Sequence, residues 1–106
     1  MSEQQFVNQL IRSKKVVVFS KSWCPSCRNT KNLFAQLNLP GDVYEVVEID
    51  KRDDEEALQA YFQAFTGART VPRVFINGEC IGGNDQTVAL HRSGKLLSRL
   101  KDVGAL

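Results

Sequence analysis

The feature that most constrains the fold of this chain is an apolar run that leads directly into a Cys-x-x-Cys motif. Residues 16–19 read Val-Val-Val-Phe, and Cys24-Pro25-Ser26-Cys27 follows after a short polar link. Three adjacent β-branched residues favour a strand that is buried on both faces. Pro25 suits the first position of a helix, where its missing N–H costs nothing. The stretch therefore predicts a buried strand, a turn, and a helix that begins just after Cys24.

This arrangement gives the two cysteines different chemistry. Cys24 falls at the N-cap, beside unpaired backbone N–H groups and the positive end of the helix dipole. Lys21 adds a positive charge nearby. Both effects stabilise a thiolate, so we predict that Cys24 is a nucleophile at neutral pH. Cys27 lies one turn further in, where it can reach the Cys24 sulfur but should be less exposed. The motif therefore predicts one attacking and one resolving cysteine.

Length and charge limit the classes of protein to which the chain can belong. Its 106 residues suit one domain, which we expect to span residues 1–106. The net charge of +2 is too small to indicate nucleic acid or membrane binding, and aromatic residues are not interleaved with basic clusters. The apolar runs are too short to cross a bilayer, and residues 1–5 lack a hydrophobic signal core. We therefore expect a soluble, cytoplasmic protein, in which three cysteines indicate redox or metal chemistry.

Hydrophobic periodicity and turn signals predict the order of helices and strands. Strands are expected over residues 16–19, 43–49, 74–76 and 79–81. Helices are expected over about residues 3–13 and 25–38, from about residue 56 to Gly67, after a cap at Asn84-Asp85, and around residues 96–103. The first two strands flank a helix, so they should be parallel with a right-handed crossover. Asn77-Gly78 predicts a hairpin between the last two strands.

Apolar residues mark the face that each of the last helices should bury. In the third helix these residues are Ala57, Leu58, Tyr61, Phe62 and Phe65. In the last helix they are Leu96, Leu97, Leu100 and Val103.

Three other features each have two interpretations. The acidic run at residues 53–56 could bind a cation, but an acidic first turn matched to the helix dipole is the favoured interpretation. Cys80 is interpreted as a small apolar strand residue in preference to a regulatory thiol. His91, the only histidine, lies beside Arg92 on a polar face and is interpreted as a surface residue in preference to a catalytic base.

Taken in order, these motifs make the chain similar to the glutaredoxins, which belong to the thioredoxin-fold superfamily. The resemblance covers essentially the whole chain. It rests on residues 21–27, on residues 67–76 with their Thr-Val-Pro, and on residues 78–83 with their Gly-Gly. It implies an α/β protein of the thioredoxin fold, with a four-stranded mixed sheet flanked by about five helices. It also implies the dithiol, Cys-Pro-x-Cys class of the family.

The resemblance implies a glutathione-dependent thiol–disulfide oxidoreductase. Cys24 would take the glutathionyl group from a protein–glutathione mixed disulfide, and a second glutathione would release it. For a protein disulfide, Cys24 would form the mixed disulfide and Cys27 would resolve it. The implied partners are glutathione, glutathionylated proteins and disulfide-bonded proteins. Glutathione would be the reductant, no metal is expected, and the protein is expected to be a monomer.

The resemblance also implies a glutathione groove. The Val71–Pro72 bond would be cis and lie against the Cys-x-x-Cys loop, which leaves the Val71 backbone free to pair with an extended ligand; a proline that merely starts an edge strand is the alternative. Matching positions assign Lys21, Gln59 and Arg69 to the glycyl carboxylate, Thr70 and Val71 to the cysteinyl backbone, and Gly83, Asn84 and Asp85 to the γ-glutamyl end.

The chain departs from the family pattern at two points in this groove. Ser26 stands where many glutaredoxins carry Tyr, so an aromatic wall is missing. Asp85-Gln86 stands where many carry Ser-Asp or Thr-Asp, which changes the γ-glutamyl contacts.

Two other functions use the same cysteines. A dimer could hold a [2Fe–2S] cluster through Cys24 and external glutathione, although Pro25 disfavours this in the family. A structural zinc site could use Cys24, Cys27, Cys80 and His91.

Overall fold

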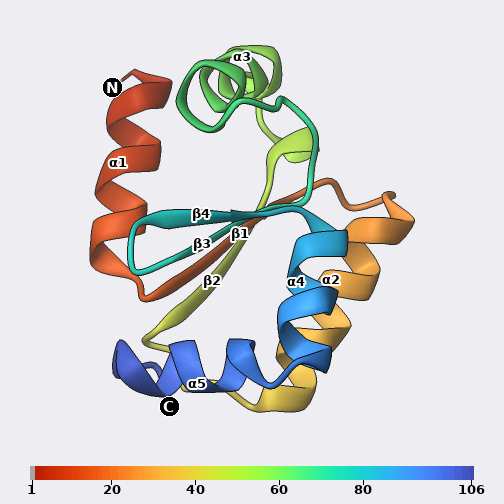
Figure 1. Cartoon of the computed structure of the whole chain (residues 1–106). Helices are drawn as coiled ribbons and strands as arrows, with labels where there is room; N and C mark the ends of the chain where they lie inside the picture. Colours follow the sequence, from red (N-terminus) through yellow and green to blue (C-terminus); the bar gives the residue numbers. More distant parts are fainter. Residues whose placement is uncertain (1) are drawn as a thin grey trace.

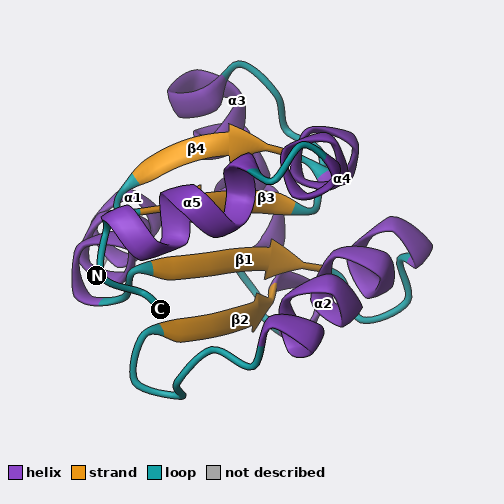
Figure 2. Cartoon of the chain, turned by 60° about the horizontal axis from the view of Figure 1, so that its bottom comes forward, coloured by secondary structure: helices purple, strands orange, loops and turns teal. Residues whose placement is uncertain are grey.

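One four-stranded mixed sheet forms the centre of the molecule. The computed structural model describes residues 2–106, so Met1 of the expected domain lies outside the described residues. The strands are β1 (Val16–Ser20), β2 (Tyr44–Glu48), β3 (Arg73–Ile76) and β4 (Glu79–Gly82). Their spatial order is β2-β1-β3-β4 (Figure 2). β1 is parallel to β2 and antiparallel to β3, and β3 is antiparallel to β4. The predicted α/β thioredoxin fold is confirmed.

Helices cover both faces of this sheet. They are α1 (Glu3–Ser13), α2 (Pro25–Leu37), α3 (Glu55–Thr66), α4 (Asn84–Arg92) and α5 (Lys95–Asp102), with a short 3-10 helix η1 (Ile49–Lys51) after β2. α1 and α3 lie on one side of the sheet, and α2, α4 and α5 lie on the other (Figure 1). Each helix predicted from the sequence is present.

β1 separates two hydrophobic cores, and this explains its unbroken apolar sequence. All five of its residues are buried. Val17 and Phe19 face the core beneath α1 and α3, whereas Val16 and Val18 face the core beneath α2 and α5. Phe19 packs against Phe62 of α3, with ring centroids 4.9 Å apart. Because alternate side chains of a strand point to opposite faces, a central strand covered on both sides must be apolar throughout.

Two predicted core residues are exposed instead. Phe65 is 45% exposed, because it lies at the edge of α3, where its ring stacks on those of Tyr61 and Phe75 at 5.2 and 6.0 Å. Leu97 is 41% exposed. In α5 the buried pair is Leu96 and Leu100, which are spaced one turn apart and lie on one face of the helix. Leu97 follows Leu96 directly, so its side chain points away from that face.

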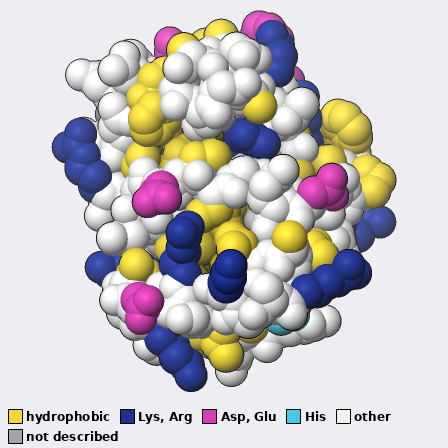
Figure 3. Space-filling view, in the orientation of Figure 1, with side chains coloured by type: hydrophobic (Ala, Val, Ile, Leu, Met, Phe, Trp, Pro, Cys, Tyr) yellow, Lys and Arg dark blue, Asp and Glu magenta, His cyan; other side chains and the backbone are white. Residues whose placement is uncertain are grey.

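The surface carries both signs of charge. In the space-filling view, Lys and Arg side chains are scattered over the visible face, with acidic side chains between them (Figure 3). Between residues 2 and 106, no helix combines the length and the apolar character required to span a membrane.

Candidate active site

The turn between β1 and α2 places Cys24 at the start of a helix. Cys24 is the N-cap of α2 with an extended backbone, and Pro25 occupies the first helical turn. The Cys24 sulfur accepts a hydrogen bond from the Cys27 backbone N–H at 3.3 Å. An N–H group and the positive end of the helix dipole therefore both face this sulfur, and both favour negative charge on it. The predicted placement of Cys24 is confirmed.

Cys27 lies in a different environment only one turn away. Its side chain is fully buried, whereas Cys24 is partly exposed. Burial, together with its side-chain hydrogen bond to Cys24, raises the pKa of Cys27 to about 11. Cys27 is therefore a protonated thiol at neutral pH. The prediction that it is the less exposed cysteine is confirmed.

An acidic residue that the sequence did not reveal anchors the loop before Cys24. Asp50 of η1 accepts a hydrogen bond from the Ser22 backbone N–H at 3.0 Å and a second from the Ser22 hydroxyl. These bonds, the one from the hydroxyl first, lower the pKa of Asp50. Because β1 and β2 are parallel, the residues after each strand meet at the same edge of the sheet, and that rule could have suggested the pair.

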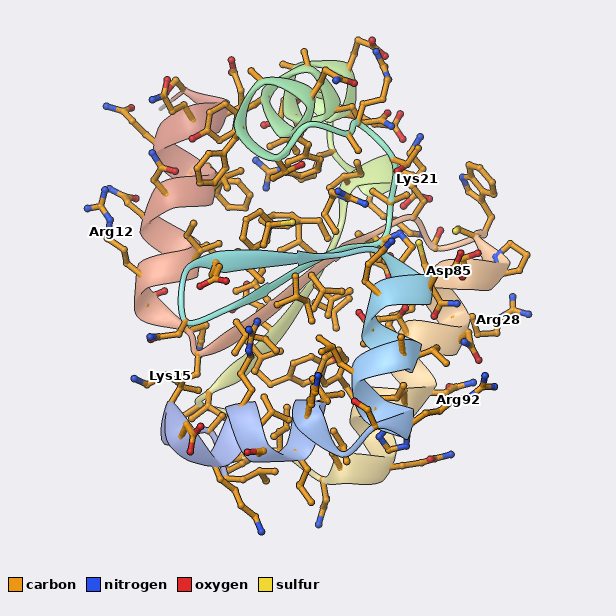
Figure 4. All side chains as sticks on the ribbon, viewed as in Figure 1. Arg12, Lys15, Lys21, Arg28, Asp85 and Arg92 are labelled. Carbon is orange, nitrogen blue, oxygen red and sulfur yellow. The ribbon has the colours of Figure 1, made fainter. Side chains whose placement is uncertain are left out.

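Lys21 and Trp23 flank this loop. The Lys21 ammonium lies 3.3 Å from a carboxylate oxygen of Glu55 and 5.7 Å from the centroid of the Trp23 ring. Trp23 is 65% exposed. Lys21 and Asp85 both lie on the side of the molecule where α2 and α4 begin (Figure 4). Lys21 is therefore near the motif as predicted, but its charge is shared with a carboxylate of α3.

The remaining residues assigned to the glycyl end lie on α3 and the loop that follows it. Gln59 donates a side-chain hydrogen bond to the Arg69 carbonyl at 3.0 Å, and the Arg69 guanidinium pairs with Glu56 at 2.7 Å. Next along the loop, Thr70 is exposed and the Val71–Pro72 bond is cis, as expected. Within residues 2–106, neither backbone polar group of Val71 has an intramolecular hydrogen-bond partner.

A polar groove of about 280 Å³ joins the motif helix, the Thr-Val-Pro loop and the start of α4. It is lined by Ser26, Thr70, Val71, Pro72, Arg73, Gly83, Asn84, Asp85 and Gln86. Five of the predicted ligand residues and the cis proline are therefore brought together, and Lys21, Gln59 and Arg69 lie outside this lining. Two larger hollows of about 590 Å³ lie between α1 and α3 and beside β4 and α4, away from Cys24, so size alone does not locate the site.

The groove also contains a buried cation that sequence reasoning missed. Arg73 is 8% exposed and takes part in no ion pair among the described residues. Its guanidinium makes only long contacts, 3.4 Å to the Pro72 carbonyl and 3.5 Å to the Thr66 hydroxyl. A β-carbon at Gly83 would lie 3.2 Å from this guanidinium and 3.3 Å from the Pro72 carbonyl, which explains a glycine there.

The start of α4 differs from the prediction. Gly83, not Asn84 or Asp85, is the N-cap, and its backbone N–H donates a hydrogen bond to the side-chain oxygen of Gln86 at 2.8 Å. The Asn84 side-chain oxygen accepts hydrogen bonds from Asn29 at 3.0 Å and from the Thr30 hydroxyl at 2.7 Å, both on α2. Asn84 therefore ties α4 to α2, which a sequence pattern could not show. Asp85 is exposed beside the groove.

Comparison with known proteins identifies the family. The family model described as Glutaredoxin matches residues 16–81, a segment that contains both motif cysteines and the cis proline. The chain belongs to the glutaredoxin family. As a glutaredoxin, it is a glutathione-dependent thiol–disulfide oxidoreductase, as the sequence predicted.

Relatives and solved structures agree over nearly the whole chain. Glutaredoxin-1 from Sus scrofa is 50% identical over 97% of this chain and 97% of its own length, and glutaredoxin-1 from Mus musculus is 48% identical over 97% and 96%. The crystal structure of a buckwheat glutaredoxin–glutathione complex matches with a TM-score of 0.91 at 43% identity, covering 98% of this chain and 92% of that one. Oxidized glutaredoxin 2 from Chlamydomonas reinhardtii matches with a TM-score of 0.86 at 40% identity, covering all of both chains.

The other candidate residues lie apart from the glutaredoxin motif. In the part of the chain that the structure describes, no group of three or more His, Cys, Asp or Glu side chains could hold a metal ion. The zinc arrangement considered from the sequence is therefore not formed among these residues. Cys80 packs partly buried against the core beneath α1 and α3, and His91 is exposed, as predicted for both.

Proposed function

We propose that this glutaredoxin reduces protein–glutathione mixed disulfides and protein disulfides, with Cys24 attacking and Cys27 resolving. The observation that carries the proposal is the asymmetry of the two thiols. The Cys24 sulfur faces an N–H group at the start of α2, whereas Cys27 is buried with a pKa of about 11. Only the thiolate form of a cysteine attacks a disulfide, so at neutral pH the first attack falls to Cys24.

Removal of glutathione from a protein needs only Cys24. Its thiolate attacks the glutathione sulfur of the mixed disulfide, and the protein leaves as a thiolate with the electron pair of the broken S–S bond. The enzyme then carries a Cys24–glutathione disulfide. A second glutathione thiolate attacks the glutathione sulfur of that disulfide, which yields glutathione disulfide and regenerates the Cys24 thiolate.

Reduction of a protein disulfide needs both cysteines. Cys24 attacks one sulfur of the substrate and forms a protein–enzyme disulfide. Cys27 then loses its proton and attacks the Cys24 sulfur, which expels the second substrate thiolate and closes a Cys24–Cys27 disulfide. Two glutathione molecules reduce this disulfide.

We also propose that the groove holds the glutathione moiety. Its lining is polar, and the free backbone groups of Val71 suit an extended peptide. The start of α4, at Gly83, Asn84 and Asp85, would meet the γ-glutamyl end, and Arg73 adds a positive charge there. Thr70 borders the cysteinyl part, and Lys21, Gln59 and Arg69 would meet the glycyl carboxylate from α3 and its loops.

The setting of this activity is part of the same proposal. Glutathione can act as reductant only where its pool is kept reduced, and three free thiols suit such a compartment, so we propose the cytoplasm. We propose that the protein acts as a monomer, with glutathionylated and disulfide-bonded proteins as its substrates.

Serine variants of the two cysteines test the mechanism. Each is assayed with glutathione on one glutathionylated protein and on one protein disulfide. Cys24→Ser should lose both activities. Cys27→Ser should lose reduction of the protein disulfide but keep removal of glutathione, and that activity should rise because the internal disulfide can no longer form.

Cys80→Ser, which changes the third thiol outside the groove, serves as the matched control and should keep both activities. The assignment is wrong if Cys27→Ser is inactive on the glutathionylated protein, or if Cys24→Ser keeps substantial activity on either substrate.

A further inference from the structure

The cations proposed for the glycyl carboxylate already have carboxylate partners within the chain. These cations are Lys21 and Arg69. Glu55 and Glu56 are adjacent in the first turn of α3, and each pairs with one of them. Glu55 lies 3.3 Å from the Lys21 ammonium, and Glu56 lies 2.7 Å from the Arg69 guanidinium. Gln59, one turn along the same helix, binds the Arg69 carbonyl and keeps that loop against α3. The first two turns of α3 thus contact both cations and the loop that carries Arg69.

These four charged groups form one network that is nearly neutral. Two positive charges face two negative ones, so the glycyl end offers little net attraction to an anion. The guanidinium of Arg69, through its hydrogen bond and its charge, lowers the pKa of Glu56, and Lys21 contributes as well. Lys21 is the most shielded member, with 16% of its side chain exposed, and Glu56 is the most exposed, with 81%. Acidic residues in a first turn are also favoured by the helix dipole, so they remain charged.

We propose that Glu55 and Glu56 are specificity-determining residues that occupy the place of the ligand's glycyl carboxylate and limit how strongly the enzyme selects for it. This inference rests on the proposed glutathione groove. A ligand carboxylate must either displace the two glutamates from Lys21 and Arg69 or approach them against like-charge repulsion. Either route cancels part of the Coulomb energy that the cations supply. The wild-type enzyme therefore distinguishes only weakly between a glycyl carboxylate and a neutral glycyl amide.

Two substrates that differ only at that end test the proposal. The first is the mixed disulfide of glutathione with a small thiol, and the second is the same compound with the glycyl carboxylate converted to an amide. The ratio of their kcat/KM values is measured for each variant. Because both substrates react at Cys24, any change in the reactivity of that thiol cancels in the ratio.

The double variant Glu55→Gln with Glu56→Gln should raise the carboxylate-to-amide ratio roughly threefold to tenfold, the range expected when two exposed ion pairs no longer compete. The single variant Glu56→Gln, at the most exposed position, should raise it by a smaller factor and does not threaten folding. Circular dichroism on heating checks that each variant is folded.

Asp53→Asn is the matched control, since it removes one negative charge just before α3 from an exposed residue that makes no ion pair among the described residues. It should leave the ratio unchanged. An unchanged ratio in folded Glu56→Gln and in the double variant overturns the inference, as does an equal rise in Asp53→Asn. Absence of wild-type activity on both substrates would instead overturn the proposed function.

Discussion

Glu48 is a partly buried carboxylate with a single charged partner within residues 2–106. It ends β2, opposite Ser20 in the parallel register, and one of its oxygens accepts a hydrogen bond from the Lys31 ammonium at 2.7 Å. The other oxygen is buried without a hydrogen-bond partner among the described residues. About a quarter of the Lys31 side chain and of the Glu48 side chain is exposed. This carboxylate therefore depends on a single cation from α2.

Lys31→Ala should destabilise the protein by about 1–3 kcal/mol, because it leaves a partly buried carboxylate without its one partner. Urea unfolding measures the free energy change. Lys101→Ala, which truncates an exposed lysine of α5 that makes no ion pair among the described residues, is the control and should cost less than about 0.5 kcal/mol. Equal losses in the two variants would show that the Lys31–Glu48 pair contributes nothing specific.

The contact between α4 and α2 sets the geometry of the groove at the scale of secondary-structure elements. α2 carries the two cysteines, and the start of α4 forms the opposite wall. Asn84 joins these two helices by accepting from Asn29 and from the fully buried Thr30 hydroxyl. The width of the groove therefore depends on one side chain that sequence reasoning had assigned to the ligand.

Asn84→Ala should cost about 1–3 kcal/mol of unfolding free energy, since it leaves the buried Thr30 hydroxyl without its acceptor. It should also raise KM for glutathione, because α4 is no longer fixed against α2. Urea unfolding and steady-state kinetics measure the two effects. Asn32→Ala, on the exposed side of α2, should change neither. A rise in KM with full stability would mean that Asn84 serves the ligand alone.

The sequence predicted the helices and strands better than it predicted the side-chain contacts between them. The apolar run of β1 and the Asn77-Gly78 turn are local signals, and both predictions are confirmed. The partners of Ser22 and Lys21 come from residues about thirty positions away, which no local pattern encodes. The acidic run at residues 53–56 starts a helix as favoured, but two of its carboxylates turn out to bind the site's own cations.

Burial of two ionisable side chains on one side of the sheet makes the whole molecule sensitive to alkali. Cys27 and Tyr44 both lie on the α2 side. Burial, and then the charge of Glu48, raises the pKa of Tyr44 to about 12 from 10.0, while that of Cys27 is raised to about 11 from 9.0. Above about pH 9 the unfolded chain therefore binds fewer protons than the folded protein. Stability is fully present below that pH and falls as the pH rises toward 12.

The free energy of unfolding should accordingly decrease steadily between pH 9 and pH 11 in the reduced protein. Cys27→Ser should flatten the early part of this decrease, and Tyr44→Phe should flatten the part above about pH 10, since each removes one of the two titrating groups. Urea unfolding at a series of pH values provides the measurement. A decrease of the same slope in both variants would assign the alkaline sensitivity to other groups.

The exposed indole beside the motif has an optical consequence. Trp23 is the only tryptophan in the chain, one residue before Cys24 and within reach of the Lys21 ammonium. Fluorescence excited at the red edge of the aromatic absorption band, where tryptophan alone absorbs, therefore originates entirely from Trp23, beside Cys24. Each change there, whether formation of a disulfide or arrival of a ligand, alters the polarity around one fluorophore. The protein thus carries its own site-specific probe, and each step of its cycle can be timed without attaching a dye.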